Sequence, residues 1–400
     1  MTAMLRTFDE IMAPLGAERF RAEYLGRQPL HLEGSADKWR SVMNWEILNR
    51  LLGMASIWST TSLPLVLDRE PVQPGAYAAP AAGRDGGQVL RPDPAKVQAW
   101  LKRGATLVAN DLDQLTPELR SFAGAMEAAL GGKVQANLYL SSKRKQGFRV
   151  HFDTHDVFAV HVEGEKTWFV FEGRAQDPIA HPMFEGLSQE HHERAKGTLW
   201  KEVRMRPGDL LYLPRGQYHY ALADEGATVH IAFGMTYPIG IDVVSWLFQR
   251  LVAEPLCRAN LPQGDSEALR ERLRALSGRL GEILAEPQAL ADIQAFQAGF
   301  RYPRAEYRLP DLIESAEERF RVRARGVRLV EQGGRAGLVR EGAREAVEVP
   351  VAVKGQVGWV LKRSEFGRGE LATAFPGEPA AKLDKLLGDL QRMALIEPTP

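Results

Sequence analysis

Cysteine is almost absent from this sequence, as are an excess of one charge and long apolar runs. The 400 residues include one cysteine, Cys257, which excludes an internal disulfide and any zinc site built from several cysteines. Lys and Arg together number 51, as do Asp and Glu, so no overall charge attracts nucleic acid or a membrane. No apolar run approaches the roughly 18 residues of a membrane span, and the N-terminus lacks a secretion signal. We therefore expect a soluble cytoplasmic protein without a membrane partner.

The pattern of the chain changes twice, and its length suits two or three domains. Residues 1–240 combine an N-terminal helical segment, an irregular Pro- and Gly-rich excursion and many short strands, which is typical of a sandwich or barrel. Residues 241–306 have apolar positions at helical spacing. Residues 307–400 return to strands, including one expected at "QVGWVLK", and end in two helices. That order suits a small winged-helix-like module.

A stretch of strand-forming residues, "GFRVHFDTHDVFAVHVEGEKTWFVFEG", carries many ionisable groups. His151 and Asp153 lie two positions apart and therefore on one face of a strand. Further along, "GDLLYLPRGQYHYAL" ends a glycine- and proline-bearing pattern on His219. This spacing resembles the second motif of the cupin barrel superfamily, in which the histidine binds a metal. By itself an H-x-D pair is a weak indication, and the second motif strengthens it.

Two imidazoles and one carboxylate on one side of a metal are the ligand set of non-haem Fe(II) oxygenases. His151, Asp153 and His219 would supply that set and leave positions open for substrate and oxygen. A carboxylate that faces a barrel interior is costly unless a charge or several donors meet it. The set therefore favours iron chemistry over other cupin metal sites.

Lys166 shares a strand face with Trp168 and Val170, because side chains alternate along a strand. A lysine that points into an apolar barrel needs an anionic partner, and the sequence supplies no acid nearby on that face. A dicarboxylate co-substrate would provide the anion, with its other end on the metal. The alternative is an exposed lysine beside the turn at residues 163–165.

Three segments together resemble the JmjC-type 2-oxoglutarate oxygenases, and the nearest branch is the ribosomal oxygenases. The segments are "NLYLSS", "QGFRVHFDTHDVFAVHVEGEKTW" and "GDLLYLPRGQYHYA", within a resemblance that covers about residues 18–240. The resemblance implies an α+β fold with a double-stranded β-helix (jelly-roll or cupin) barrel, a helical dimerisation region and a C-terminal winged-helix-like module. It also implies that His151, Asp153 and His219 bind Fe(II) and that Lys166 binds 2-oxoglutarate.

Further positions follow from the same resemblance. Asn137 matches a residue that lines the co-substrate pocket, and Tyr139, on the same strand face, would lie near the substrate. His161 stands where related sequences often have Gln. It either orients the pocket or is a buried histidine with its own partners. Ala232 and Gly234 stand where hydroxyl residues are frequent, so the cofactor class transfers more safely than the substrate class.

These observations predict an Fe(II)- and 2-oxoglutarate-dependent hydroxylase of a protein or peptide side chain, with arginine or histidine of a ribosomal protein as the type of substrate. No catalytic residue beyond the metal ligands is expected, because the iron does the oxidation. One alternative is the same chemistry on a small metabolite or biosynthetic peptide, and another is a metal-binding cupin without turnover. We expect a homodimer through the helices of residues 241–306. We expect no nucleic-acid partner, since the helix "PAAKLDKLLGDLQRM" is not notably basic.

Overall fold

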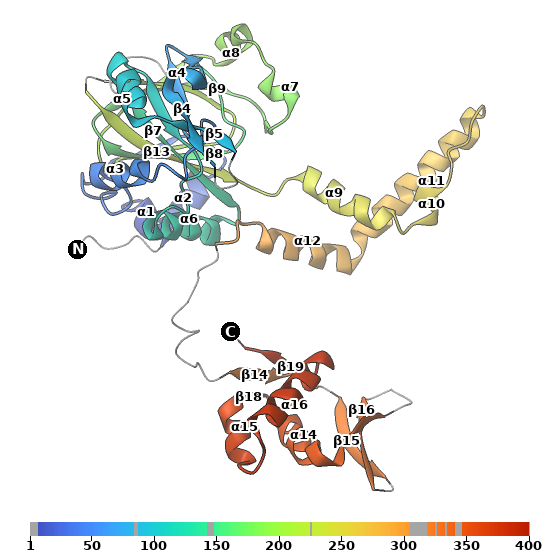
Figure 1. Ribbon diagram of the computed structural model, residues 1–400. Helices are drawn as coiled ribbons and strands as arrows, with labels where there is room; N and C mark the ends of the chain where they lie inside the picture. The colour runs from blue at the N-terminus through green and yellow to red at the C-terminus, as the bar shows by residue number, and fades with distance from the viewer. Residues whose placement is uncertain are drawn as a thin grey trace. The chain divides into compact units, whose positions relative to one another are not determined.

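The chain divides into two compact units, residues 1–304 and 305–400. The structure is a computed structural model (Figure 1) and describes residues 7–83, 87–141, 148–224, 226–304, 318–324, 326–332, 334–340 and 346–399. The division lies two residues before the boundary expected at 306/307, whereas the boundary expected at 240/241 stays a prediction.

The first unit is built on a large antiparallel sheet with the strand order β1-β11-β8-β13-β7-β6-β2-β3. These strands are β1 (Leu30–Leu32), β2 (Leu65–Leu67), β3 (Glu70–Pro71), β6 (Thr106–Ala109), β7 (Lys133–Ser141), β8 (Asp156–Glu163), β11 (Leu210–Leu213) and β13 (Thr228–Thr236). A second antiparallel sheet has the order β10-β9-β12, with β9 (Lys166–Arg174), β10 (Leu199–Met205) and β12 (Gln217–Ala223). This mixed architecture, with a large antiparallel sheet, is consistent with the barrel core expected from the sequence.

Helices cover one face of the large sheet (Figure 1). They are α1 (Phe8–Met12), α2 (Ala17–Glu23), α3 (Trp45–Gly53), α5 (Pro94–Arg103) and α6 (Pro117–Leu130). On β13, Ile231 and Phe233 face these helices and belong to the main core, and the Phe233 ring stacks on Phe122 of α6 at 4.3 Å. The intervening residues of β13 point to the opposite face, because strand side chains alternate. That face is therefore free to line a cavity.

The excursion over residues 68–95 contains more regular structure than its Pro and Gly content predicts. It holds α4 (Pro74–Tyr77) and a hairpin of β4 (Ala78–Ala82) and β5 (Gln88–Pro92), in register from Ala78↔Pro92 to Ala82↔Gln88. The prediction of an irregular segment was wrong here because a two-stranded ladder consists of edge strands only, and edge strands tolerate prolines such as Pro80 and Pro92. Two short helices, α7 (Pro182–Glu185) and α8 (Gln189–Ala195), follow β9.

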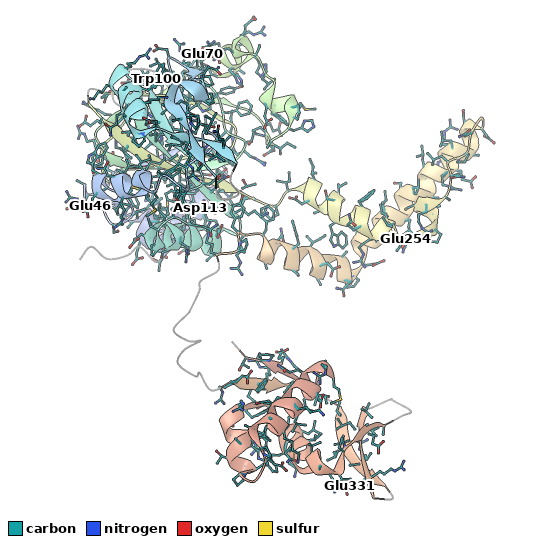
Figure 2. All side chains as sticks on the ribbon, viewed as in Figure 1. Glu46, Glu70, Trp100, Asp113, Glu254 and Glu331 are labelled. Atoms are coloured by element: carbon teal, nitrogen blue, oxygen red, sulfur yellow. The ribbon has the colours of Figure 1, made fainter. Side chains whose placement is uncertain are left out.

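The helices expected after residue 240 are present and extend away from the sheets (Figure 1). They are α9 (Gly240–Leu251), α10 (Pro255–Arg258), α11 (Ser266–Ala285) and α12 (Pro287–Gly299). Glu254, labelled in Figure 2, accepts hydrogen bonds from Nε and Nη2 of Arg279 and so ties α11 to the start of α10. No helix among the described residues is long and apolar enough to cross a membrane.

The described residues of the second unit form two three-stranded antiparallel sheets and three α-helices around a core of their own. Its elements are β14 (Arg319–Val322), β15 (Val327–Gln332), β16 (Arg335–Arg340), β17 (Val347–Val349), η1 (Val351–Val353), α14 (Lys354–Leu361), β18 (Glu365–Gly367), α15 (Arg368–Ala374), α16 (Ala380–Arg392) and β19 (Ile396–Pro398). The strand expected at "QVGWVLK" is wrong, because this segment forms α14. Val357 and Val360 are buried there at helical spacing, and a short apolar run does not distinguish helix from strand by its periodicity.

Candidate metal centre and cavity

Two backbone hydrogen bonds bring His151 and His219 together although they lie far apart in the sequence. His151 N donates to His219 O at 3.1 Å and His219 N donates to His151 O at 2.9 Å, which makes an isolated antiparallel bridge. Asp153 follows two residues after His151. One ligand atom from each of His151, Asp153 and His219 lies within 4.8 Å of the others, so the structure brings the three predicted ligands into one cluster.

Hydrogen bonds to carbonyl groups orient both imidazoles toward the cluster. Nδ1 of His151 lies 2.7 Å from Arg149 O, and Nδ1 of His219 lies 2.9 Å from Gln217 O. A bonded Nδ1–H leaves Nε2 as the electron-pair donor, which is the usual second-sphere arrangement at metal sites. The Trp168 ring packs on His219 with centroids 5.5 Å apart and planes at 29°. The imidazoles are therefore held for binding an ion.

The charges at this cluster suit a divalent cation. Burial lowers the pKa of His219 to about 4, so its imidazole is neutral at physiological pH. Burial pushes the pKa of Asp153 upward, but His219, His151 and His155 outweigh it and hold that pKa below its ordinary value. The Asp153 side chain is deep yet 29% exposed, because it faces a cavity. Neutral imidazoles and an ionised carboxylate are the protonation states that a metal requires.

A cavity of about 370 Å³ lies beside the three ligands, between the two sheets. Alternate residues of β7 and β13 form one wall, since they share the inner face of the large sheet. These wall residues are Lys133, Gln135, Asn137, Tyr139 and Ser141 on β7, and His230, Ala232, Gly234 and Thr236 on β13. Lys166 and Trp168 of β9 form part of the opposite wall. The volume is in the range of small-molecule sites.

Lys166 is buried in this cavity and has no acidic partner. Its side chain is 7% exposed and makes no hydrogen bond or ion pair with any residue that the structure describes. Burial lowers its pKa to about 8. Val170, which pairs with His219, lies four residues further along β9, so Lys166 is about 13 Å from the metal ligands along the strand. A lysine side chain and a five-carbon dicarboxylate together cover such a separation. The cavity thus fits a diacid that binds the metal at its other end.

Two predicted pocket residues line the cavity and a third does not. Oδ1 of Asn137 accepts a hydrogen bond from Asp111 N at 3.2 Å, and the Tyr139 ring stacks on His230 with centroids 4.8 Å apart. His161 is fully buried and is absent from the lining residues that the structure describes. Its Nε2 lies 3.0 Å from Gly164 O and 3.3 Å from the Thr228 hydroxyl. His161 thus matches the interpretation as a buried histidine with its own partners.

Three further residues line the cavity: His155, which the sequence places near the metal ligands, and His230 and Tyr302, which it does not indicate as pocket residues. His230 shares the inner face of β13 with Ala232 and Gly234, so strand alternation was a signal that could have found it. His155 packs on Gly234, where an added Cβ would lie 2.6 Å from its ring. Tyr302 follows α12 and reaches the cavity from outside the barrel. Nothing local in the sequence indicates that contact.

Comparison with known proteins gives a domain match and several distant relatives. Residues 113–243 match the family profile of the JmjC domain. The chain is 24% identical to the Bacillus subtilis protein YxbC over 72% of this chain and 90% of that protein. It is 30% identical to ribosomal oxygenase 2 of Bos taurus over 48% of this chain and 44% of that protein. The chain spans less than half the length of the ribosomal oxygenases and demethylase–hydroxylases that it matches.

One similar solved structure is YcfD, a ribosomal oxygenase from Escherichia coli in complex with cobalt and 2-oxoglutarate. It is 14% identical to this chain, with a TM-score of 0.47, and the superposition covers 96% of this chain and 98% of that one.

Proposed function

Because residues 113–243 match the profile of the JmjC domain, we propose that this protein is an Fe(II)- and 2-oxoglutarate-dependent dioxygenase that hydroxylates a side chain of a protein or peptide. The observation that carries the proposal is the combination of a His–Asp–His cluster with a buried, unpaired ammonium group in one cavity. His151, Asp153 and His219 hold the metal, and Lys166 holds the distal carboxylate of the co-substrate. A buried charge without a partner is strongly unfavourable, so an anion completes this site.

The iron, when bound, supplies the oxidation of a C–H bond by O2 and 2-oxoglutarate. The chain's own residues bind and orient. The three ligands would leave coordination positions for the co-substrate and O2, and the walls of β7, β9 and β13 exclude bulk water from the cavity. Asn137 and Tyr139 line the β7 wall of this cavity. No separate general base is required.

The cavity lining favours a neutral acceptor side chain over a guanidinium group. Asp153, a metal ligand, is the one acidic residue among the described residues that line the cavity. An arginine side chain would bring a charge with no carboxylate to pair with it, at a cost of several kcal/mol. Gln135, Thr236 and Tyr302 offer uncharged hydrogen-bonding groups instead. We therefore favour histidine of a ribosomal protein as the acceptor. Relatives bear the names ribosomal oxygenase and histidyl-hydroxylase, which supports this choice.

The decisive experiment combines turnover with mass spectrometry. Fe(II)-loaded protein is incubated with 2-oxoglutarate and ribosomal proteins from a strain that lacks the gene, and succinate and the masses of the ribosomal proteins are measured. We expect succinate together with the gain of one oxygen atom on a histidine. The His151→Ala variant should produce neither succinate nor the hydroxylated histidine. The matched control, His191→Ala on the exposed face of α8, should produce both.

Each other outcome overturns a defined part of the proposal. If 2-oxoglutarate is not consumed, the remaining interpretation is a metal-binding protein without turnover. If the added oxygen is found on an arginine, the choice of a neutral acceptor side chain is wrong, whereas the proposed hydroxylation reaction stands. Consumption without a change in any ribosomal protein would favour a small metabolite or biosynthetic peptide. The proposal places the protein in the cytoplasm, which cell fractionation tests.

The helical region is proposed to form a homodimer. One face of α9 exposes apolar residues at spacings of three to four, with Val244 and Phe248 each 63% exposed. Nothing within the described residues covers this face, and a second copy of the chain would bury it. Sedimentation should show a dimer for the wild type and a monomer for Phe248→Glu. Gln249 is an exposed polar residue of the same helix, and the control variant Gln249→Glu should remain a dimer. A wild-type monomer would contradict the proposal.

The second unit is proposed to be a winged-helix-like module, as its order of strands and helices suggests. Several of its exposed arginines are paired with acids, for example Arg321 with Glu365 at 2.8 Å and Arg323 with Glu397. This pairing leaves less free positive charge for nucleic acid. A gel-shift assay with the full chain should therefore show no binding of DNA at physiological salt.

A further inference from the structure

His230 is a buried histidine for which the sequence indicates no role. It lies in the middle of β13, where it pairs with Tyr139 of β7 on one side and with His161 of β8 on the other. Its side chain is on the inner face of the sheet and lines the same cavity as the metal cluster and Lys166. Only 3% of its surface is exposed. A polar ring in such a position calls for a partner.

Aromatic contacts hold the His230 ring in one orientation. It stacks on Tyr139 with ring centroids 4.8 Å apart and planes at 7°. The Trp168 ring meets it edge to face at 5.4 Å and 82°. The two contacts come from opposite walls of the cavity, so rotation of the imidazole would break both. The ring is therefore a rigid part of the cavity wall rather than a movable side chain.

The imidazole of His230 has no hydrogen-bond partner among the described residues. Its Nδ1 atom is buried and unpaired, and the Nε2 atom makes no hydrogen bond either. An unsatisfied buried polar group costs about 1–3 kcal/mol. Nδ1 of His161, the neighbour in the same row, is also unpaired, but its Nε2 contacts Gly164 O at 3.0 Å. In His230 the Nε2 atom is not sealed off as Nδ1 is, so a ligand in the cavity could bond to it.

The electrostatics of the cavity indicate what this ligand is. Burial, and then the nearby charge of Lys166, lower the pKa of His230 well below its ordinary value. The ring is therefore neutral and carries one N–H donor. Lys166 and Trp168 lie two residues apart on the same face of β9, and Trp168 contacts the His230 ring, so the ammonium group and the imidazole line the same part of the cavity. An anionic group that reaches the ammonium group would therefore approach the imidazole as well.

We propose that His230 donates a hydrogen bond to the distal carboxylate held by Lys166 and, with the Tyr139 ring stacked on it, forms the wall that limits the length of the bound diacid. This inference rests on the proposed function and deepens it. Lys166 supplies the positive charge that attracts the distal carboxylate. His230 orients that carboxylate and limits how far the diacid can extend. The substrate class that the wall selects is a five-carbon 2-oxo diacid over its longer homologues.

The first test measures binding rather than turnover. The full chain is loaded with Mn(II), and the Kd for 2-oxoglutarate is measured by calorimetry. His230→Phe keeps a ring for the stack but removes the donor, and it should weaken binding about 10–100-fold, the equivalent of one hydrogen bond to a charged group. His230→Gln restores an N–H donor and should recover most of that loss. His191→Phe on exposed α8 is the matched control and should bind as the wild type does.

The second test addresses length. The Kd for 2-oxoadipate, which has one more methylene, is compared with that for 2-oxoglutarate in the wild type and in His230→Ala. Removal of the wall should shift the ratio of the two affinities toward the longer acid by about fourfold, which is the value of one buried methylene. An unchanged ratio would overturn the role in length selection.

A third measurement observes the wild-type protein directly and needs a variant only to assign the signal. In Zn(II)-loaded wild-type protein with ¹⁵N-labelled histidine, 2-oxoglutarate should slow the solvent exchange of one imidazole N–H and shift its resonance. The resonance is assigned by its loss in His230→Gln. If wild-type protein binds 2-oxoglutarate but neither this signal nor the Kd of His230→Phe changes, the inference fails and the proposed function stands. If the wild type does not bind 2-oxoglutarate, both fail.

Discussion

The guanidinium group of Arg304 donates two parallel hydrogen bonds to the carboxylate of Glu127, from Nε to Oε2 at 2.8 Å and from Nη2 to Oε1 at 2.9 Å. Asp113, labelled in Figure 2, accepts a third from Nη1 at 2.7 Å. All three side chains are more than 90% buried. This cluster fixes the chain beside β7 as it returns from α12, and it thereby places Tyr302 at the cavity.

Replacing Arg304 by Met should therefore destabilise the first unit. Two carboxylates would remain buried without a cation, which costs about 3–5 kcal/mol in comparable cases. Urea unfolding of the full chain measures the change. Arg301→Met, an exposed arginine three residues earlier, should change the free energy of unfolding by less than about 0.5 kcal/mol. Equal effects of the two substitutions would show that the ion pairs contribute little.

Lys166 predicts a pH dependence of stability in the ligand-free protein. Its pKa is about 8 in the folded chain and 10.5 as the reference value, so between these pH values the unfolded state binds more protons. Stability should therefore rise with pH from about 8 to 10.5. The facing histidines, His161 and His230, have lowered pKa values and stay neutral in this range. The free energy of unfolding is measured for the wild type and for Lys166→Met across this pH range. The variant should lack the rise, so the difference between the two proteins gives the contribution of Lys166.

The same titration should weaken binding of the co-substrate. Above about pH 8 the ammonium group of Lys166 loses its proton, and the affinity for 2-oxoglutarate should fall by at most about tenfold per pH unit. Lys166→Met should bind 2-oxoglutarate weakly at every pH while it retains Mn(II). Calorimetry with Mn(II)-loaded protein measures the affinity for 2-oxoglutarate of the wild type and of Lys166→Met at each pH. A flat pH profile in the wild type would argue against an ionic contact with Lys166.

Removal of one metal ligand should abolish binding of the metal ion without unfolding the protein. His219→Ala deletes a neutral donor from the cluster and leaves two ligands, which are too few for tight binding. The visible absorption of Co(II)-loaded protein reports the site, and circular dichroism reports the fold. His191→Ala should keep the absorption. A spectrum retained in His219→Ala would place the ion elsewhere.

Two glycine-to-alanine substitutions should differ because of what the new methyl group meets. In Gly34→Ala the Cβ would lie 2.1 Å from the carbonyl oxygen of Gly208, and neither backbone can yield cheaply. In Gly234→Ala it would lie 2.6 Å from the end of the His155 side chain, which can rotate. Thermal unfolding should show a loss above about 2 kcal/mol for the first and below about 1 kcal/mol for the second. The displaced His155 in Gly234→Ala should alter the cavity, and 2-oxoglutarate affinity should then change more than stability.

Much of the candidate site could be predicted because its signals are local. His151 and Asp153 lie on one strand at a two-residue spacing, and His219 follows a turn pattern of fixed length. Lys166 was identified by alternation along β9 together with the lack of an acid on its face. The resemblance to JmjC oxygenases, which the domain match confirms, was visible in the same segments.

Other features could not be predicted because they depend on neighbours distant in the sequence. The segment of α14 is a helix since its valines meet the core of the second unit, and the apolar run itself is ambiguous. The environment of His230 depends on the register of β13 with two other strands. Tyr302 contacts the cavity because Arg304 is anchored by acids more than 170 residues away.

The sequence by itself determined which kinds of side chain face inward, because alternation along a strand and the spacing of a turn are properties of a few neighbouring residues. Only the tertiary structure decided which of these side chains meet. The pairing of three strands sets a neutral imidazole beside a buried ammonium group, and that juxtaposition depends on strand register, which no single segment encodes.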